Sequence, residues 1–421
     1  MVMIPFSLSV ETAETPGGSS LSAREAEWLA TGFATRLSKG DCLEIVRHPA
    51  RFDFSRGAIQ ELPSYRPDSI RPFQVDLRSA DLSNLDLSRR LEDLFHADFD
   101  SRTRWPAELP NGFDPRRMME LGTNPGLGLR ELHKQGITGK GVGIAIIDQV
   151  LLVDHVEYKD RLKLYEEIHS LAASPAQMHG PAVASIAVGR SAGVAPEADL
   201  YYIAEMHIEP KAQGGGFDFD FTWLAKSIDR LLEVNARLPS AHRIRVISTS
   251  VGWSPHQKGY QEVTDAAARA KQAGVFLIST ALEQTHGLAF HGLGREPLRD
   301  PDLPASFGLG SWWKKMFLDG LRRFPPDKRL LVPMDARATA SPTGERDYVY
   351  YSSGGWSWSV PYLAGLYALA CQVKPEITPE AFWTSALKTG DTVKIRQGDT
   401  EIELGNIVNP AALLKTLGRQ N

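Results

Sequence analysis

The stretch VGIAIID, from Val142 to Asp148, decides the fold that this sequence predicts. It is apolar until it stops at an acidic residue, which is the pattern of a strand buried on both faces. Similar apolar runs return at 199–206, 244–252 and 275–280, and helix-like segments lie between them at 181–189, 221–238 and 263–274. Strands that alternate with helices favour an α/β fold, and we expect three α/β/α layers around a mainly parallel sheet.

The bulk composition restricts the class of protein. The net charge of −4 over 421 residues gives no sign of a nucleic-acid or membrane-surface partner. Two distant cysteines, Cys42 and Cys371, argue against a disulfide framework and favour a reducing compartment. No run reaches the roughly 18 apolar residues of a membrane span, so we expect a cytoplasmic protein.

The sequence divides near residue 115 into an N-terminal extension (1–115) and a larger domain (116–421). Within the extension, residues 1–20 have the composition of a disordered tail. Ser22 and Gly40 are suitable boundaries for a helix over 22–40. Leucines recur near every fifth residue over 75–94, which hints at a pentapeptide-type β-solenoid turn. Two or three such units are too few to stack into a stable solenoid, and a capping or docking segment is therefore favoured for these residues.

Three reactive side chains lie where predicted strands end or helices begin. Asp148 ends the strand VGIAIID, His179 precedes a helix of small residues, and Ser357 stands just before the apolar run PYLAGLYALACQV at 361–373. A serine hydroxyl is a weak nucleophile that needs a base, and a carboxylate fixes the tautomer of that base. Taken singly, each residue is also typical of a turn, a structural histidine or a helix cap.

The order Asp, His, Ser and the blocks around it resemble the subtilisin-like serine proteases, or subtilases. The resemblance covers about residues 120–415 and runs through the blocks GKGVGIAIIDQ, HGPAVASIAVG, GVAPEADLYYIA, VISTSVG, GGWSWSVPYLAG and GNIVNPAALL. It implies a serine endopeptidase acting on a protein or peptide substrate. In that role Ser357 is the nucleophile, His179 the base and Asp148 its orienting carboxylate, and Ser250, Val251 and Gly252 pair with an extended substrate.

The sequence also departs from the family pattern. Subtilases present an asparagine to the oxyanion where this chain has Glu283, and losing that amide costs about 10²–10³ in turnover. Glu283 can donate a hydrogen bond if a dry pocket keeps it protonated, or Gln284 can supply an amide after a one-residue shift. The alternative is a pseudoprotease that keeps the fold and its peptide groove for binding or regulation. Trp356 and Trp358, which flank Ser357, either shield the site or only pack.

A long insertion, 285–329, follows the oxyanion position and reads as a Gly- and Pro-rich loop that can wall a restrictive cleft. Its His286 and His291 lack the further ligands of a zinc site, so we assign no metal and expect no cofactor. Calcium sites are frequent in subtilases, but no compact acidic loop here suggests one. The N-terminal extension is either a pro-region, as the resemblance implies, or a permanent docking module.

Overall fold

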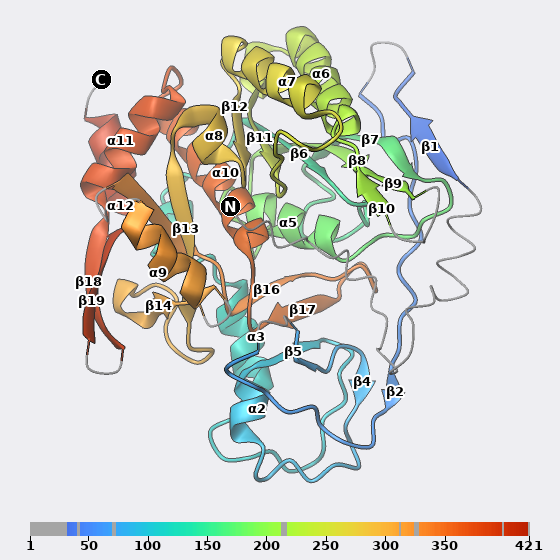
Figure 1. The fold of residues 1–421 in the computed structure, drawn as a ribbon, viewed down its shortest axis with the longest axis vertical. Coiled ribbons are helices and arrows are strands. Elements are labelled where there is room, and N and C mark those ends of the chain that lie inside the picture. The colour runs from blue at the N-terminus through green and yellow to red at the C-terminus, as the bar shows by residue number, and fades with distance from the viewer. Residues whose placement is uncertain are drawn as a thin grey trace.

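The computed structural model describes residues 32–39, 43–69, 73–211, 217–310, 313–323, 328–397 and 400–419. At its centre is a six-stranded sheet in the order β1-β7-β8-β6-β11-β12 (Figure 1). The neighbours pair in parallel except β1, which runs antiparallel to β7. The strands are β1 Phe33–Arg36, β6 Gly143–Asp148, β7 Leu162–Leu171, β8 Asp199–Glu205, β11 Ile244–Thr249 and β12 Phe276–Ser279.

Successive residues of β6 serve two different cores, because side chains alternate across a strand. Ile144 and Ile146 pack in the core that contains α5 and α10, whereas Ala145 and Ile147 pack in the core that contains α6 and α7. The helices are α5 His179–Val188, α6 Thr222–Arg237, α7 Tyr260–Gln272 and α10 Trp356–Val373. The predicted three-layer α/β/α fold with a mainly parallel sheet is therefore confirmed.

Helix α10 is the central element on its side of the sheet. Its residues from Ser357 to Cys371 are all buried, as expected for a helix that is apolar on every face. Gly365 permits close packing against the chain that follows α5, since a Cβ there would lie 2.5 Å from Cβ of Val194. In the part of the chain that the structure describes, no helix combines the length and apolarity needed to span a bilayer.

The segment 285–329 contains regular structure instead of the predicted loop. Strand β13 (Ala289–Arg295) pairs in parallel with β15 (Arg329–Pro333) across the intervening residues. They belong to a second sheet in the order β14-β13-β15-β19-β18. The other elements of this region are α8 Leu282–His286, β14 Phe307–Leu309, α9 Lys314–Arg323, α11 Pro379–Thr389, β18 Asp391–Gln397, β19 Thr400–Ile407 and α12 Pro410–Gly418. The prediction of a loop over 285–329 is wrong, because the pairing of strands that lie far apart in the chain is not visible in the local sequence pattern.

The N-terminal region combines an edge strand with a small separate core. The prediction of a helix over 22–40 is wrong at Phe33–Arg36, because these residues form β1 and extend the central sheet. Several other predicted features lie outside the described residues: the tail 1–20, the cap Ser22, and the positions Gly40 and Cys42. Leu77, Leu82 and Leu87 are buried. The strands around them pair in parallel, β2 (Gly57–Ala58) with β4 (Ala80–Asp81) and β3 (Val75–Asp76) with β5 (Ala97–Asp100).

This small core is attached to the larger domain through a strand pair. Strand β5 runs antiparallel to β17 (Tyr348–Tyr351), which forms a hairpin with β16 (Arg337–Ala340). Ala336, Ala338 and Tyr350 of the hairpin region share a core with the leucines of the extension. Figure 1 shows this lobe beneath the main sheet. The remaining elements are α2 Leu91–Phe95, α3 Pro115–Thr123, α4 Leu129–Lys134, β9 Ile208–Pro210, β10 Phe217–Phe219 and the short 3-10 helices η1 Ser240–His242 and η2 Pro304–Ser306.

Candidate active site

Asp148 and His179 are in direct contact at the carboxyl edge of the central sheet. Asp148 is the last residue of β6 and His179 is the first residue of α5. Oδ1 of Asp148 lies 2.7 Å from Nδ1 of His179, and both side chains are largely buried. Because an ionised carboxylate only accepts, this bond places the proton on Nδ1 and leaves Nε2 as the basic nitrogen.

Gln149 fixes both members of this pair. Its backbone N–H donates to Oδ1 of Asp148 at 2.8 Å, and its side-chain Oε1 accepts from the backbone N–H of His179 at 3.3 Å. Its own carbonyl accepts from the hydroxyl of Tyr202, which is fully buried. The sequence analysis did not identify Gln149, because nothing in the residue type or spacing indicates this bridging role.

Ser357 lies in the first turn of α10, next to Trp358, whose ring contacts the imidazole of His179. The ring of Trp358 has its centroid 5.4 Å from that of His179, which brings the start of α10 next to the candidate base. Ser357 is only 1% exposed, and its Oγ has no hydrogen-bond partner among the described residues. Within the described part of the chain, the hydroxyls of Ser248, Ser353 and Ser359 are buried without a partner as well, so this feature alone does not distinguish Ser357 from a structural serine.

Pro361 explains why Ser250 touches the candidate nucleophile. A proline at this helix position cannot donate to the carbonyl four residues earlier, which is that of Ser357. The hydroxyl of Ser250 donates to this carbonyl at 3.2 Å instead. Ser250, Val251 and Gly252 follow the end of β11, and the Val251 carbonyl accepts from the backbone N–H of Thr280 at 3.2 Å. The predicted substrate strand thus lies beside the first turn of α10.

The predicted oxyanion residues are both exposed. Glu283 and Gln284 lie in the short helix α8, and the Gln284 amide donates to the hydroxyl of Tyr260 at 3.2 Å. Glu283 therefore does not lie in the dry pocket that one of the two alternatives requires. The role of either residue toward an oxyanion stays a prediction.

Aromatic rings from the 285–329 segment surround Trp356, the residue before Ser357. Trp313 stacks on Trp356 with ring centroids 5.5 Å apart, and Phe290 and His291 contact the same indole. Trp313 also donates from Nε1 to the carbonyl of Gly354 at 3.1 Å. This collar of rings was not predicted, because it depends on the pairing of β13 with β15.

His291 of this collar titrates far from its ordinary range. Burial lowers the pKa of His291 to about 4. The bond to the Gly292 carbonyl opposes this decrease, and the charge of Arg329 adds to it to a smaller extent. The unfolded chain thus takes up this proton near pH 6.5, whereas the folded chain resists it down to about pH 4. The stability associated with neutral His291 is therefore intact above pH 6.5 and lost as the pH falls toward 4.

We expect His291 to contribute up to about 3 kcal/mol of the loss in unfolding free energy between pH 7 and pH 4. Urea unfolding of the wild type and of His291→Gln at both pH values measures this contribution. The difference between the two pH values should shrink in the variant, since glutamine does not titrate. An equal pH dependence in both proteins would contradict the assignment.

Among the described residues, no group of three or more His, Cys, Asp or Glu side chains is placed to hold a metal ion. His286, the second histidine considered for a metal, lies against the ring of Phe276. Burial lowers its pKa to about 4, helped by the charge of Lys271. Both histidines thus occupy packed positions.

The sheet, its two helical layers and the Asp–His pair at its carboxyl edge define a protease-like α/β fold. Residues 139–290 match the model of the Subtilase family, which is the family that the sequence blocks resemble. The matched region includes Asp148 and His179, and Ser357 lies beyond it.

The individual proteins to which the chain is similar share only a small part of its sequence. Over 132 residues the chain is 30% identical to the subtilisin-like protease PopC of Myxococcus xanthus strain DK1622, a match that covers 29% of this chain and only 26% of that relative. Among solved structures, the prenylagaramide maturation protease PagA is similar with a TM-score of 0.47 and 17% identity, over 69% of this chain and 98% of that one. The PatG macrocyclase domain has a TM-score of 0.45 and 16% identity, over 69% and 94%.

Proposed function

We propose that the chain is a serine endopeptidase that cleaves a protein or peptide substrate with restricted specificity. The observation that carries the proposal is the 2.7 Å bond between Asp148 and His179, next to the helix turn that bears Ser357. This pair needs no metal or other cofactor to act on a peptide. We place the activity in the cytoplasm, which fits the cysteine usage.

In the proposed reaction, Oγ of Ser357 attacks the carbonyl carbon of the scissile bond while Nε2 of His179 takes its proton. The imidazolium that forms is stabilised by Asp148, and it returns the proton to the leaving amine. Water then attacks the acyl-enzyme with the same base, which releases the acid and regenerates Ser357. The residues at 250–252 would hold the extended substrate beside the nucleophile.

A peptide-binding pseudoprotease is the second candidate. The 1% exposure of Ser357 and the exposed Glu283, where subtilases place an amide, both favour it. In that case the segment 250–252 would bind a peptide that the chain does not cleave.

Labelling with a fluorophosphonate probe separates the two functions, because the probe reacts with activated serines. We expect the full chain to gain the mass of one adduct, which peptide mapping should place on Ser357. The control is the same protein unfolded in urea, where the serine is not activated and no adduct should form. No adduct on a folded chain, verified by near-UV circular dichroism, would favour the binding module.

A further inference from the structure

The segment that leads into His179 is hydrogen-bonded to the N-terminal region at several points. We call residues 172–177 the approach segment, and the described residues 32–39 and 43–50 the N-terminal arm. Four hydrogen bonds connect them: Ala172 N to Gly32 O at 3.0 Å, Arg36 Nη2 to Ala172 O at 2.6 Å, Arg47 Nη1 to Ser174 O at 3.0 Å and Ala176 N to Ala50 O at 2.8 Å. The conformation of the approach segment, which leads to His179, therefore depends on its hydrogen bonds to the N-terminal arm.

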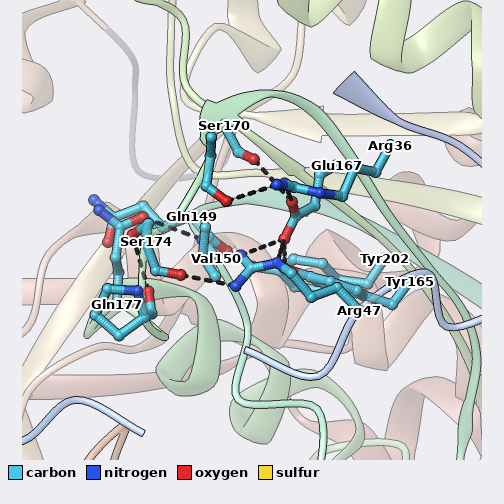
Figure 2. A network of polar contacts seen from close by, with 12 residues as sticks. Arg36, Arg47, Gln149, Val150, Tyr165, Glu167, Ser170, Ser174, Gln177 and Tyr202 are labelled. Carbon is cyan, nitrogen blue, oxygen red and sulfur yellow. Dashed lines mark hydrogen bonds and ion pairs between the residues drawn. The ribbon is translucent and has the colours of Figure 1, made fainter. Parts of the chain in front are cut away.

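A buried carboxylate anchors the arm to the sheet. Glu167 of β7 is 0% exposed and forms ion pairs with both Arg36 and Arg47. The hydroxyl of Tyr165 donates to the same carboxylate at 2.8 Å. Figure 2 shows the two guanidinium groups converging on Glu167. A buried carboxylate that loses its cations is strongly destabilising, so removal of the arm would leave Glu167 in an unfavourable state.

The approach segment is bonded in turn to the residues that follow Asp148. Gln177 donates from its backbone N–H to the Val150 carbonyl at 2.9 Å and accepts the Val150 N–H on its side chain at 3.2 Å. Gln149, next to Val150, contacts both Asp148 and His179. Figure 2 shows Gln149, Val150 and Gln177 close to Ser174, with the guanidinium of Arg47 reaching toward Ser174 from the side of Glu167. A continuous chain of contacts thus leads from Arg47 to the Asp–His pair.

Arg47 is the residue that joins the anchor to the approach segment. Its Nε donates to Glu167 at 2.8 Å while its Nη1 donates to the Ser174 carbonyl at 3.0 Å. A guanidinium can make these two bonds at once because its donors have a fixed, forked geometry. A lysine ammonium is a compact point charge, so it can neutralise Glu167 without holding Ser174 in the same way.

We propose that Arg47 is a positioning residue for His179, and that the N-terminal arm is a retained part of the catalytic domain and not a removable pro-region. The positioning role rests on the proposed peptidase function, whereas the contact between the arm and the approach segment does not. The N-terminal extension would then be a permanent module whose arm also supports the candidate base His179.

The test compares Arg47→Met, Arg47→Lys and a matched control, Ser38→Ala, in the full chain. Ser38 belongs to the same arm but bonds to Glu166, which faces Arg230 on the other side of β7. Amide hydrogen exchange over 171–179 reports the positioning of the approach segment without any need for activity. The rate of fluorophosphonate labelling as a function of pH reports the ionisation of the candidate base.

For Arg47→Met we expect exchange over 172–177 to accelerate at least about tenfold and labelling to slow by a similar factor, since small displacements of a base are costly. The midpoint of the labelling profile should fall, because a loosened contact with Asp148 stabilises the imidazolium less. Arg47→Lys should recover the melting temperature of the wild type while keeping part of both defects. Ser38→Ala should match the wild type in exchange and in labelling.

Wild-type exchange together with a wild-type labelling profile in Arg47→Met would overturn the positioning role. An active, labelled species whose intact mass lacks residues 33–50 would overturn the retention of the arm. If the wild type fails to label, the peptidase proposal fails, and the positioning role of Arg47 in catalysis fails with it. Accelerated exchange in Arg47→Met would then still support the arm's hold on the approach segment, and unchanged exchange would overturn that as well.

Discussion

Replacing His179 by alanine is expected to lower the rate of peptide hydrolysis about 10⁶-fold, the scale seen when the base of a serine-protease triad is removed. Without the imidazole, the Ser357 hydroxyl has no group to accept its proton. Asp148→Asn should cost about 10⁴-fold, because the amide favours the wrong tautomer of His179 while leaving the packing intact. The rates are measured as kcat/KM on a peptide substrate, with fluorophosphonate labelling as a second readout.

The combination of the two substitutions tests whether the residues act as one unit. The double variant should be no slower than His179→Ala, because Asp148 acts only through the imidazole. Asp160→Asn is the control, since Asp160 is exposed, stands before β7 at the opposite edge of the sheet and should keep wild-type activity. Additive losses in the double variant, or a His179→Ala protein that retains activity, would show that these residues have separate roles.

The parts of the structure that the sequence predicts are those where local pattern and tertiary environment agree. The run from Val142 to Asp148 is apolar because both faces of β6 are covered, and the same pattern identifies β8, β11 and β12. Helix α10 is apolar on all sides for the same reason. The Asp–His contact follows from this topology, since the ends of parallel strands and the starts of the following helices meet at one edge of the sheet.

The parts that the sequence does not predict depend on contacts between distant segments. Residues 33–36 have an acceptable helical pattern, but their backbone pairs with the free edge of β7 and Arg36 pairs with Glu167. Tertiary contacts of this kind override a weak local propensity. The exposure of Glu283 and the bond from Ser250 to Ser357 likewise depend on how α8 and α10 are placed. The sequence motifs indicate which residue type stands at such a position, but they do not indicate whether its side chain is buried or which residues it contacts.

Gly180→Ala is expected to slow catalysis about 10²-fold through its effect on the Asp–His pair, since a displacement near 1 Å can cost this much. A Cβ at Gly180 would lie 2.5 Å from the Gln149 carbonyl oxygen and 2.5 Å from the Tyr202 hydroxyl oxygen. Neither atom can yield easily, because they are hydrogen-bonded to each other and Tyr202 is fully buried. The backbone of Gln149 or the start of α5 must therefore move, and Gln149 contacts both Asp148 and His179.

The same crowding should destabilise the fold by about 1–3 kcal/mol, the usual cost of adding a methyl group to a packed interior. Gly308→Ala is the matched control, because a Cβ at Gly308 meets nothing within 4 Å and should leave both rate and stability unchanged. Labelling rates and urea unfolding of the three proteins measure the two effects separately. If Gly180→Ala loses stability but labels at the wild-type rate, then α5 and Gln149 separate without disturbing the Asp–His bond. That result would contradict the positioning of His179 by Gln149, and it would place the control of the base in its side-chain contact with Asp148 alone.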